Sequence, residues 1–258
     1  MKTFNDDSVM NGMEGDQMEM IANHTMLKNT SKIDLNLNQK KPLQITIREP
    51  GSAGTHLIGM LLAIFGSVPL LIKGALNGGT YEFIAMSVFM ASMILLYGAS
   101  ATYHSVNLTG DALKVFKRMD HMMIFVLIAG SYTPTCMLIL PQPLGYRLLA
   151  VVWAIAALGM IFKFFWVTCP KWVSSVLYIS MGWVVLFAVR PLLEALSLPA
   201  FLWLLGGGVV YTVGGVIYAL KLPIFNSRHK DFGSHEVFHL FVLGGSLCHY
   251  VFTYFFVA

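Results

Sequence analysis

The chain has 258 residues, of which 56% are hydrophobic and only 12% are charged, and its mean hydropathy is +0.67. Soluble domains carry about a quarter charged residues, so this composition excludes an ordinary soluble enzyme and indicates an integral membrane protein. The formal net charge is +4, and we expect no nucleic-acid partner, because the basic residues follow the pattern that a membrane protein needs. The three cysteines lie far apart and predict neither a disulfide framework nor a cysteine-rich metal site.

Residues 1–50 differ from the rest of the chain. They are polar and rich in Met and Asn, and they lack a long apolar run. Such a segment cannot bury enough apolar surface to offset the entropy of ordering. We therefore predict a largely disordered cytoplasmic N-terminal arm over 1–50, followed by a membrane domain over 51–258.

The membrane domain contains seven apolar runs of about 20 residues, each long enough to cross the ~30 Å hydrocarbon core as a helix. The predicted fold class is therefore an all-α membrane protein with seven transmembrane helices. Short connections predict that helices adjacent in sequence are antiparallel neighbours, and glycines in the sixth run, Gly206 to Gly208 with Gly214 and Gly215, predict close packing. The runs lie at about 53–73, 81–104, 120–140, 147–168, 172–192, 200–220 and 234–257.

The basic residues predict the orientation of these helices. Only three basic residues, Lys73, Arg147 and Arg190, lie on one side of the predicted membrane, whereas fourteen lie on the other side. The positive-inside rule then predicts a cytoplasmic N-terminus and an outside C-terminus, in the plasma or inner membrane of a cell. The other fourteen lie on the opposite side: Lys2, Lys28, Lys32, Lys40, Lys41, Arg48, Lys114, Lys117, Arg118, Lys163, Lys171, Lys221, Arg228 and Lys230.

Ionisable residues gather at the predicted cytoplasmic ends of three helices. His104 ends the second run, Asp120 begins the third, and His235 and His239 begin the seventh. Ionisable groups at membrane depth are costly and usually functional, and a cluster of imidazoles suits Zn²⁺. Ser100 precedes His104 by one helical turn, which predicts that it lies beside the site.

The remaining histidines are assigned lesser roles. His121 is a candidate for supporting the site without touching a metal, because it points about 100° away from Asp120 on an ideal helix. His249 lies about 15 Å deeper than His239 by helical rise, too far for a shared metal. His56 is expected at a loop edge near the start of the first helix.

The segment His235-Glu236-Val237-Phe238-His239 matches the H-E-x-x-H pattern of zinc metalloproteases. A protease of that kind commonly takes its third ligand from downstream, but the residues after His239 hold no acid and only one histidine, His249. The third ligand is therefore predicted to be His104, from upstream. Glu236 is turned about 100° from His235 and is expected to face a neighbouring helix or the interface.

Three segments together resemble the hemolysin III family, bacterial members of the progestin and adipoQ receptor (PAQR) superfamily. They are YGASATYHS with Ser100 and His104, RMDHMMIFVLIAGSYTPTC with Asp120, and SHEVFHLFVLGGSLCHYVF with His235 and His239. The resemblance covers about residues 50–258. It implies a Zn²⁺ ion held by His104, His235 and His239, with Asp120 bonded to a zinc-bound water and Ser100 close by. Pro134 is expected to kink the third helix.

The resemblance leaves three functions open. A zinc-dependent hydrolase of a membrane-lipid amide or ester would use Asp120 as general base and Ser100 to place the carbonyl oxygen, with the lipid in the helical cavity. In a non-enzymatic receptor or sensor of membrane lipids, the zinc would be structural. A membrane-permeabilising hemolysin is the third function, and the sequence offers it least, because the polar residues cluster at one face of the membrane.

Overall fold

The computed structural model describes residues 17, 19–20, 22–30, 47–220 and 233–258. The chain divides into two units, Met1–Thr46 and Ile47–Ala258. In the first unit the described residues are helical and exposed, and the predicted disorder of the arm stays a prediction. Several basic residues used to predict the orientation lie outside the described residues, namely Lys2, Lys32, Lys40, Lys41, Lys221, Arg228 and Lys230.

The second unit is a bundle of long apolar helices, and seven segments of its described residues are long and apolar enough to span a membrane. The seven-helix prediction is therefore confirmed, while the orientation of the termini stays a prediction. The elements are α2 (Pro50–Asn77), α3 (Thr80–Ser105), α4 (Gly110–Pro134), η1 (Thr135–Ile139), α5 (Leu144–Phe165), α6 (Lys171–Gly182), η2 (Trp183–Ala188), α7 (Val189–Ala195), α8 (Leu198–Leu220) and α10 (Ser234–Phe256).

Two spans differ from the simple helices that were expected. Helix α4 begins at Gly110, ten residues before the predicted start, because its charged first turns are helical although they are not apolar. Pro134 ends the α-helical part of this span, and the next five residues form the π-helix η1; short π-helical segments often occur at functional sites. The fifth span consists of α6, η2 and α7, with a 3₁₀ segment in its middle.

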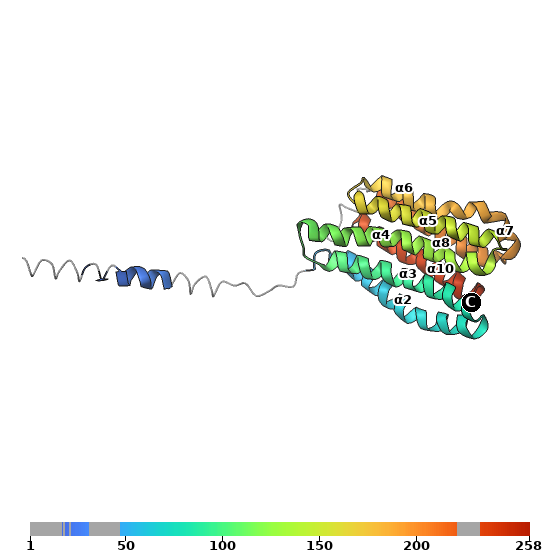
Figure 1. Ribbon diagram of the computed structural model, residues 1–258, viewed down its shortest axis with the longest axis horizontal. Coiled ribbons are helices and arrows are strands. Elements are labelled where there is room, and N and C mark those ends of the chain that lie inside the picture. The colour runs from blue at the N-terminus through green and yellow to red at the C-terminus, as the bar shows by residue number, and fades with distance from the viewer. Residues whose placement is uncertain (1–16, 18, 21, 31–46, 221–232) are drawn as a thin grey trace, which may run out of the picture. The chain divides into compact units, whose positions relative to one another are not determined.

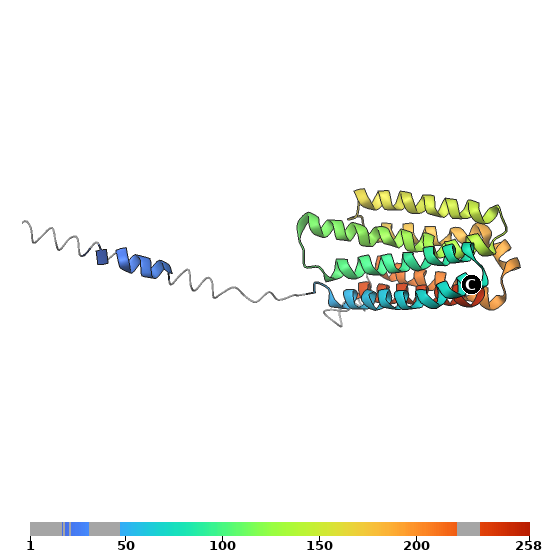
Figure 2. The same cartoon turned by 60° about the horizontal axis from the view of Figure 1, so that its bottom comes forward.

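The helices run side by side along the long axis of the bundle (Figure 1). Consecutive spans pack against one another, and α10 returns to pack against α2. Helix α5 lies at the outer edge of the bundle (Figure 2). One apolar core joins α4 to α5, α6 and α7, and another joins α2, α3, α4 and α10.

Helices α8 and α10 approach closely at their glycines, as the small residues predicted. A Cβ atom on Gly214 would lie 2.5 Å from Cβ of Phe241, and one on Gly245 would lie 2.5 Å from the ring of Tyr211. Gly207 leaves room for a side chain of α10 in the same way, whereas a Cβ atom on Gly206 or Gly208 would meet nothing within 4 Å. The close packing therefore depends on some of the predicted glycines and not on all of them.

Candidate metal centre

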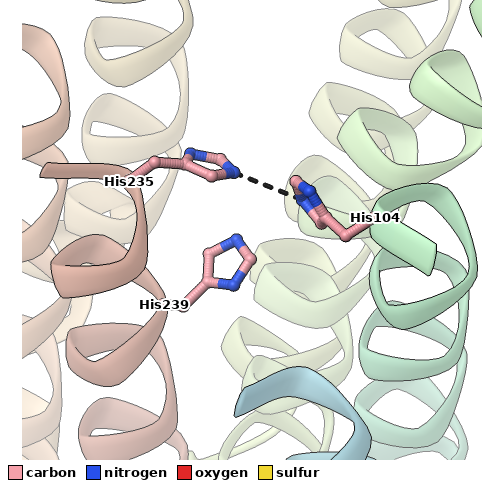
Figure 3. A group of neighbouring side chains, drawn as sticks. All are labelled: His104, His235 and His239. Atoms are coloured by element: carbon pink, nitrogen blue, oxygen red, sulfur yellow. Dashed lines mark hydrogen bonds between the residues drawn. The ribbon is translucent and has the colours of Figure 1, made fainter. Parts of the chain in front are cut away.

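Three histidines from two helices face one another at one end of the bundle, called here the triad end (Figure 3). His104 comes from the last turn of α3, and His235 and His239 come from the first two turns of α10. Each offers a nitrogen atom, and these three nitrogens lie within 4.8 Å of one another. The structure thus brings together the three residues that were predicted as metal ligands.

The spacing of the triad suits a small tetrahedral ion. The Nε2 atoms of His104 and His235 are 3.2 Å apart. Two nitrogens that each bind Zn²⁺ at 2.0–2.1 Å in tetrahedral geometry are separated by about 3.3 Å. His104 and His239 are almost fully buried, so the triad can hold a metal ion largely removed from solvent.

Glu49 orients His104 from the residue just before α2. Its backbone N–H donates to the carbonyl of His104 at 3.0 Å, and its carboxylate accepts a hydrogen bond from Nδ1 of the same residue. This bond with His104 is the main reason that the pKa of the Glu49 carboxyl falls below its ordinary value. Because an ionised carboxylate only accepts, Nδ1 carries the hydrogen and Nε2 keeps its lone pair for a metal, as is usual for metal-bound histidines.

Helix α2 also contacts the first turns of α10. The Thr55 hydroxyl lies 3.3 Å from Nδ1 of His239. Glu236 accepts a hydrogen bond from the Ser52 hydroxyl and another, at 2.7 Å, from the backbone N–H of Gly233, which caps the start of α10. As predicted, the Glu in H-E-x-x-H is turned toward a neighbouring helix, and in this position it anchors α10.

Asp120 and Ser100 line the same cavity as His235 and His239. The Asp120 carboxylate is buried, and one of its oxygens is 3.3 Å from Nδ1 of His121. The hydroxyl of Ser100 is fully buried and is close enough to the Asp120 carboxylate to interact with it. The two side chains therefore form one polar group in the cavity wall.

His56 is a site residue that the sequence reasoning assigned wrongly. It is 3% exposed, and its ring stacks on His239 with 3.6 Å between ring centroids. Neither of its ring nitrogens has a hydrogen-bond partner. The expected position at a loop edge was wrong because α2 begins at Pro50, which places His56 nearly two turns inside the helix. His56 lies four residues after Ser52, so the two share one face of the helix. That spacing is the signal that could have identified His56 as a residue facing the bundle interior.

A large cavity extends from the triad end into the bundle. Its wall runs from Asp120 and His235 at the triad end to Thr135 and Leu192 farther along the bundle. Every membrane span except α5 contributes to its wall, and most wall residues are apolar, including Leu127, Phe201 and Val242. The polar histidine triad thus lies beside a space that suits hydrocarbon.

Comparison with known proteins supports the resemblance seen in the sequence. A family model described as "Haemolysin-III related" matches residues 45–250. The protein named Hemolysin-3 of Bacillus cereus is 39% identical over 203 residues, which cover 79% of this chain and 89% of that protein. The Hemolysin-3 homolog of Bacillus subtilis (strain 168) is 40% identical over 204 residues, 78% of this chain and 91% of that protein.

A more distant similarity extends to animals. The adiponectin receptor protein of Drosophila melanogaster is 22% identical over 220 residues, which cover 78% of this chain and 49% of that protein, and this similarity fits the PAQR superfamily. Seven apolar helices and these relatives together indicate a multi-pass membrane protein, in bacteria one of the inner membrane. Because the family model covers most of the membrane domain, the chain belongs to the haemolysin-III related family.

Proposed function

We propose that the protein is a zinc-dependent hydrolase that cleaves an amide or ester bond in a membrane lipid. The observation that carries this proposal is the position of the histidine triad at one end of a mainly apolar cavity, with Asp120 and Ser100 in its wall. Reactive groups therefore lie where the polar end of a lipid would be, and apolar side chains lie where its acyl chain would be.

His104, His235 and His239 would hold the Zn²⁺ ion. Three imidazole ligands leave one position open, and the bound metal supplies Lewis-acid chemistry, polarising a substrate carbonyl and making water more acidic. The donor set fits this ion because all three ligands are neutral nitrogens and the Glu49 carboxylate fixes the tautomer of His104.

Asp120 would act as the general base. Its carboxylate is buried in the cavity wall, where it can take a proton from the attacking water and return it to the leaving group. Ser100 would donate a hydrogen bond from its buried hydroxyl to the carbonyl oxygen of the substrate. The acyl chain would lie along α4 and α10, beside Ile124 and Val242.

A non-enzymatic lipid receptor with a structural metal is the second candidate. The triad joins α3 to α10, two helices that are also linked by a hydrogen bond from Tyr97 to Ser246. A metal that fixed these helices together would stabilise the bundle without taking part in chemistry. The name of the Drosophila relative, an adiponectin receptor protein, points in the same direction.

Metal content and hydrolysis together test the proposal. We would measure bound metal by mass spectrometry in the purified wild-type protein and in the His104→Ala and His239→Ala variants, and then follow release of fatty acid from a lipid amide and a lipid ester. One zinc per chain that both variants lose, with hydrolysis only in the wild type, is the expected result. Zinc that the variants lose without any hydrolysis would favour the receptor, and zinc that persists without His104 would refute the site.

A further inference from the structure

A second polar site lies deep in the cavity, away from the triad. Its central residue, His249, is on α10 and lines the cavity. It is only 9% exposed, and its Nδ1 atom is fully buried without a hydrogen-bond partner. Because a buried polar atom without a partner is costly, a ligand in the cavity that reached this nitrogen would supply a hydrogen bond that the protein does not.

The protein holds the ring of His249 in place from two sides. The ring stacks on Tyr211 of α8, with 5.4 Å between centroids and 19° between planes. The ring edge formed by Cδ2 and Nε2 lies over Gly207. A Cβ atom on Gly207 would come within 2.8 Å of both atoms. The Tyr211 hydroxyl is fixed in turn, 2.8 Å from the hydroxyl of Ser246. The imidazole is therefore a preorganised feature of the cavity.

Thr135 supplies a second unpartnered group to the same cavity. It is the first residue of η1, it is 3% exposed, and its hydroxyl oxygen has no hydrogen-bond partner. Thr135 lies fifteen residues beyond Asp120 along α4, and His249 lies fourteen residues beyond His235 along α10. By helical rise both are about 20 Å from the triad end, so the two groups are at a similar depth.

The chemistry of these two groups selects a neutral ligand. Charged groups are expensive at this depth of a membrane. An imidazole Nδ1 can donate or accept according to its tautomer, and a threonine hydroxyl can do both. A hydroxyl group on a lipid chain is a neutral partner that can satisfy either kind of atom.

We infer that His249 and Thr135 form a subsite that recognises a hydroxyl group carried on the acyl chain of the lipid. This inference rests on the proposed function in taking the ligand to be a lipid whose polar end is at the triad. It adds that the preferred lipid has a hydroxylated chain, with the hydroxyl well separated from the bond that is cleaved.

Fatty-acid binding tests the subsite without requiring turnover or metal. The purified full-length chain in detergent would be titrated with a fluorescent fatty acid, which is then displaced by octadecanoic acid or by its analogues with a hydroxyl near the carboxyl, at mid-chain or near the methyl end. A hydrogen bond gained in the cavity corresponds to about three- to tenfold tighter binding. We expect the largest gain for the hydroxyl near the methyl end, which an extended chain carries to about the depth of the two groups, and no gain for one beside the carboxyl.

Two variants assign the preference to the subsite. His249→Phe keeps a ring to stack on Tyr211 but removes both nitrogens, and Thr135→Val removes the hydroxyl at nearly constant volume. Each is expected to bring the affinity ratio of hydroxylated to unsubstituted acid close to one. Tyr250→Phe is the matched control, because this neighbour of His249 donates its hydroxyl to the carbonyl of Gly66 and is not part of the cavity wall.

The outcomes separate this inference from the proposed function. Equal affinity for all the acids, or a hydroxyl preference that both variants retain, would overturn the subsite and leave hydrolysis untouched. A preference that depends on His249 or Thr135, in a protein that hydrolyses no lipid, would support the subsite and count against the enzyme. If no fatty acid binds, the cavity is not an acyl-chain site and the inference is wrong.

Discussion

The two halves of α10 face one cavity but are supported very differently. In the first half, α2 supports His239 through Thr55 and anchors Glu236 through Ser52. In the second half, His249 is held by packing alone, against Tyr211 and Gly207, and its Nδ1 atom has no hydrogen-bond partner. A metal ion needs ligands fixed within a fraction of an ångström, and supporting hydrogen bonds provide this. A lipid that binds and leaves instead needs polar atoms whose hydrogen bonds are not already made within the protein.

The sharpest test of the first half of α10 is to remove the proposed general base while leaving the three proposed metal ligands in place. We expect Asp120→Asn to retain zinc and to lower lipid hydrolysis by about 10²- to 10⁴-fold, because an amide cannot act as general base. Metal content and initial rates measured on the same preparation check this. Asp111→Asn is the control, since Asp111 lies on the same helix in an exposed pair with Lys114.

Loss of metal from the Asp120→Asn protein would contradict this assignment and make Asp120 a direct ligand. Fatty-acid binding in the second half of the cavity is expected to be unchanged in the same variant. The two halves would then be separable, with chemistry in one and chain recognition in the other.

The next largest effect is expected when the support of a metal ligand is removed. Glu49→Ala is expected to weaken zinc binding by about 10- to 100-fold, the usual cost of losing a carboxylate that orients a histidine ligand. Glu49→Gln, which can still accept from Nδ1, is expected to lose less. Competition with a zinc chelator measures both affinities. Glu194→Ala is the control, because Glu194 forms an exposed pair with Arg190 at the end of α7.

An affinity of the Glu49→Ala protein equal to that of the wild type would show that His104 does not need its carboxylate partner. The triad would then be no more preorganised than His249. The contrast between the two halves of α10 would be lost.

The second half of α10 is tested by adding a methyl group at Gly207, against which His249 packs. Gly207→Ala is expected to displace the imidazole, to lower the free energy of unfolding by about 1–3 kcal/mol through overpacking, and to abolish the preference for hydroxylated fatty acids. Gly206→Ala is the matched control, since a Cβ atom there meets nothing within 4 Å. Thermal unfolding in detergent and fatty-acid displacement measure the two effects. Equal stability of the two variants would show that Gly207 does not constrain His249.

The sequence predicted which three histidines come together, because composition and helix topology determine their placement. Apolar runs located the helices, and alternation of direction placed His104 and His235 at one end of the bundle. The contacts of α2 could not be predicted in this way. Glu49 was assigned to a disordered arm and His56 to a loop edge, because both assignments depended on where α2 begins, and helix ends are poorly marked in apolar sequence.

The sequence also did not indicate which single polar residues are buried. Lys163 was counted among the basic residues of the predicted cytoplasmic side, yet its side chain is fully buried, and its amine lies 2.6 Å from the hydroxyl of Ser174 and 3.1 Å from the sulfur of Cys169. His249 was judged only by its distance from His239. Its contacts with Tyr211 and Gly207 come from another helix, and a pattern along one helix carries no information about them.

The smallest expected effect concerns the anchor between α2 and α10. Ser52→Ala removes the hydroxyl that donates to Glu236, and we expect it to lower the free energy of unfolding by about 1 kcal/mol with zinc affinity nearly unchanged. Ser67→Ala is the control, because Ser67 lies on the same helix and its hydroxyl donates to the backbone carbonyl of Ile64 in that helix. Glu236 would keep its bond to Gly233, so α10 would still begin at the same residue and present His235 and His239 as before. A loss of zinc affinity as large as that in Glu49→Ala would mean instead that α2 positions all three histidines as one unit.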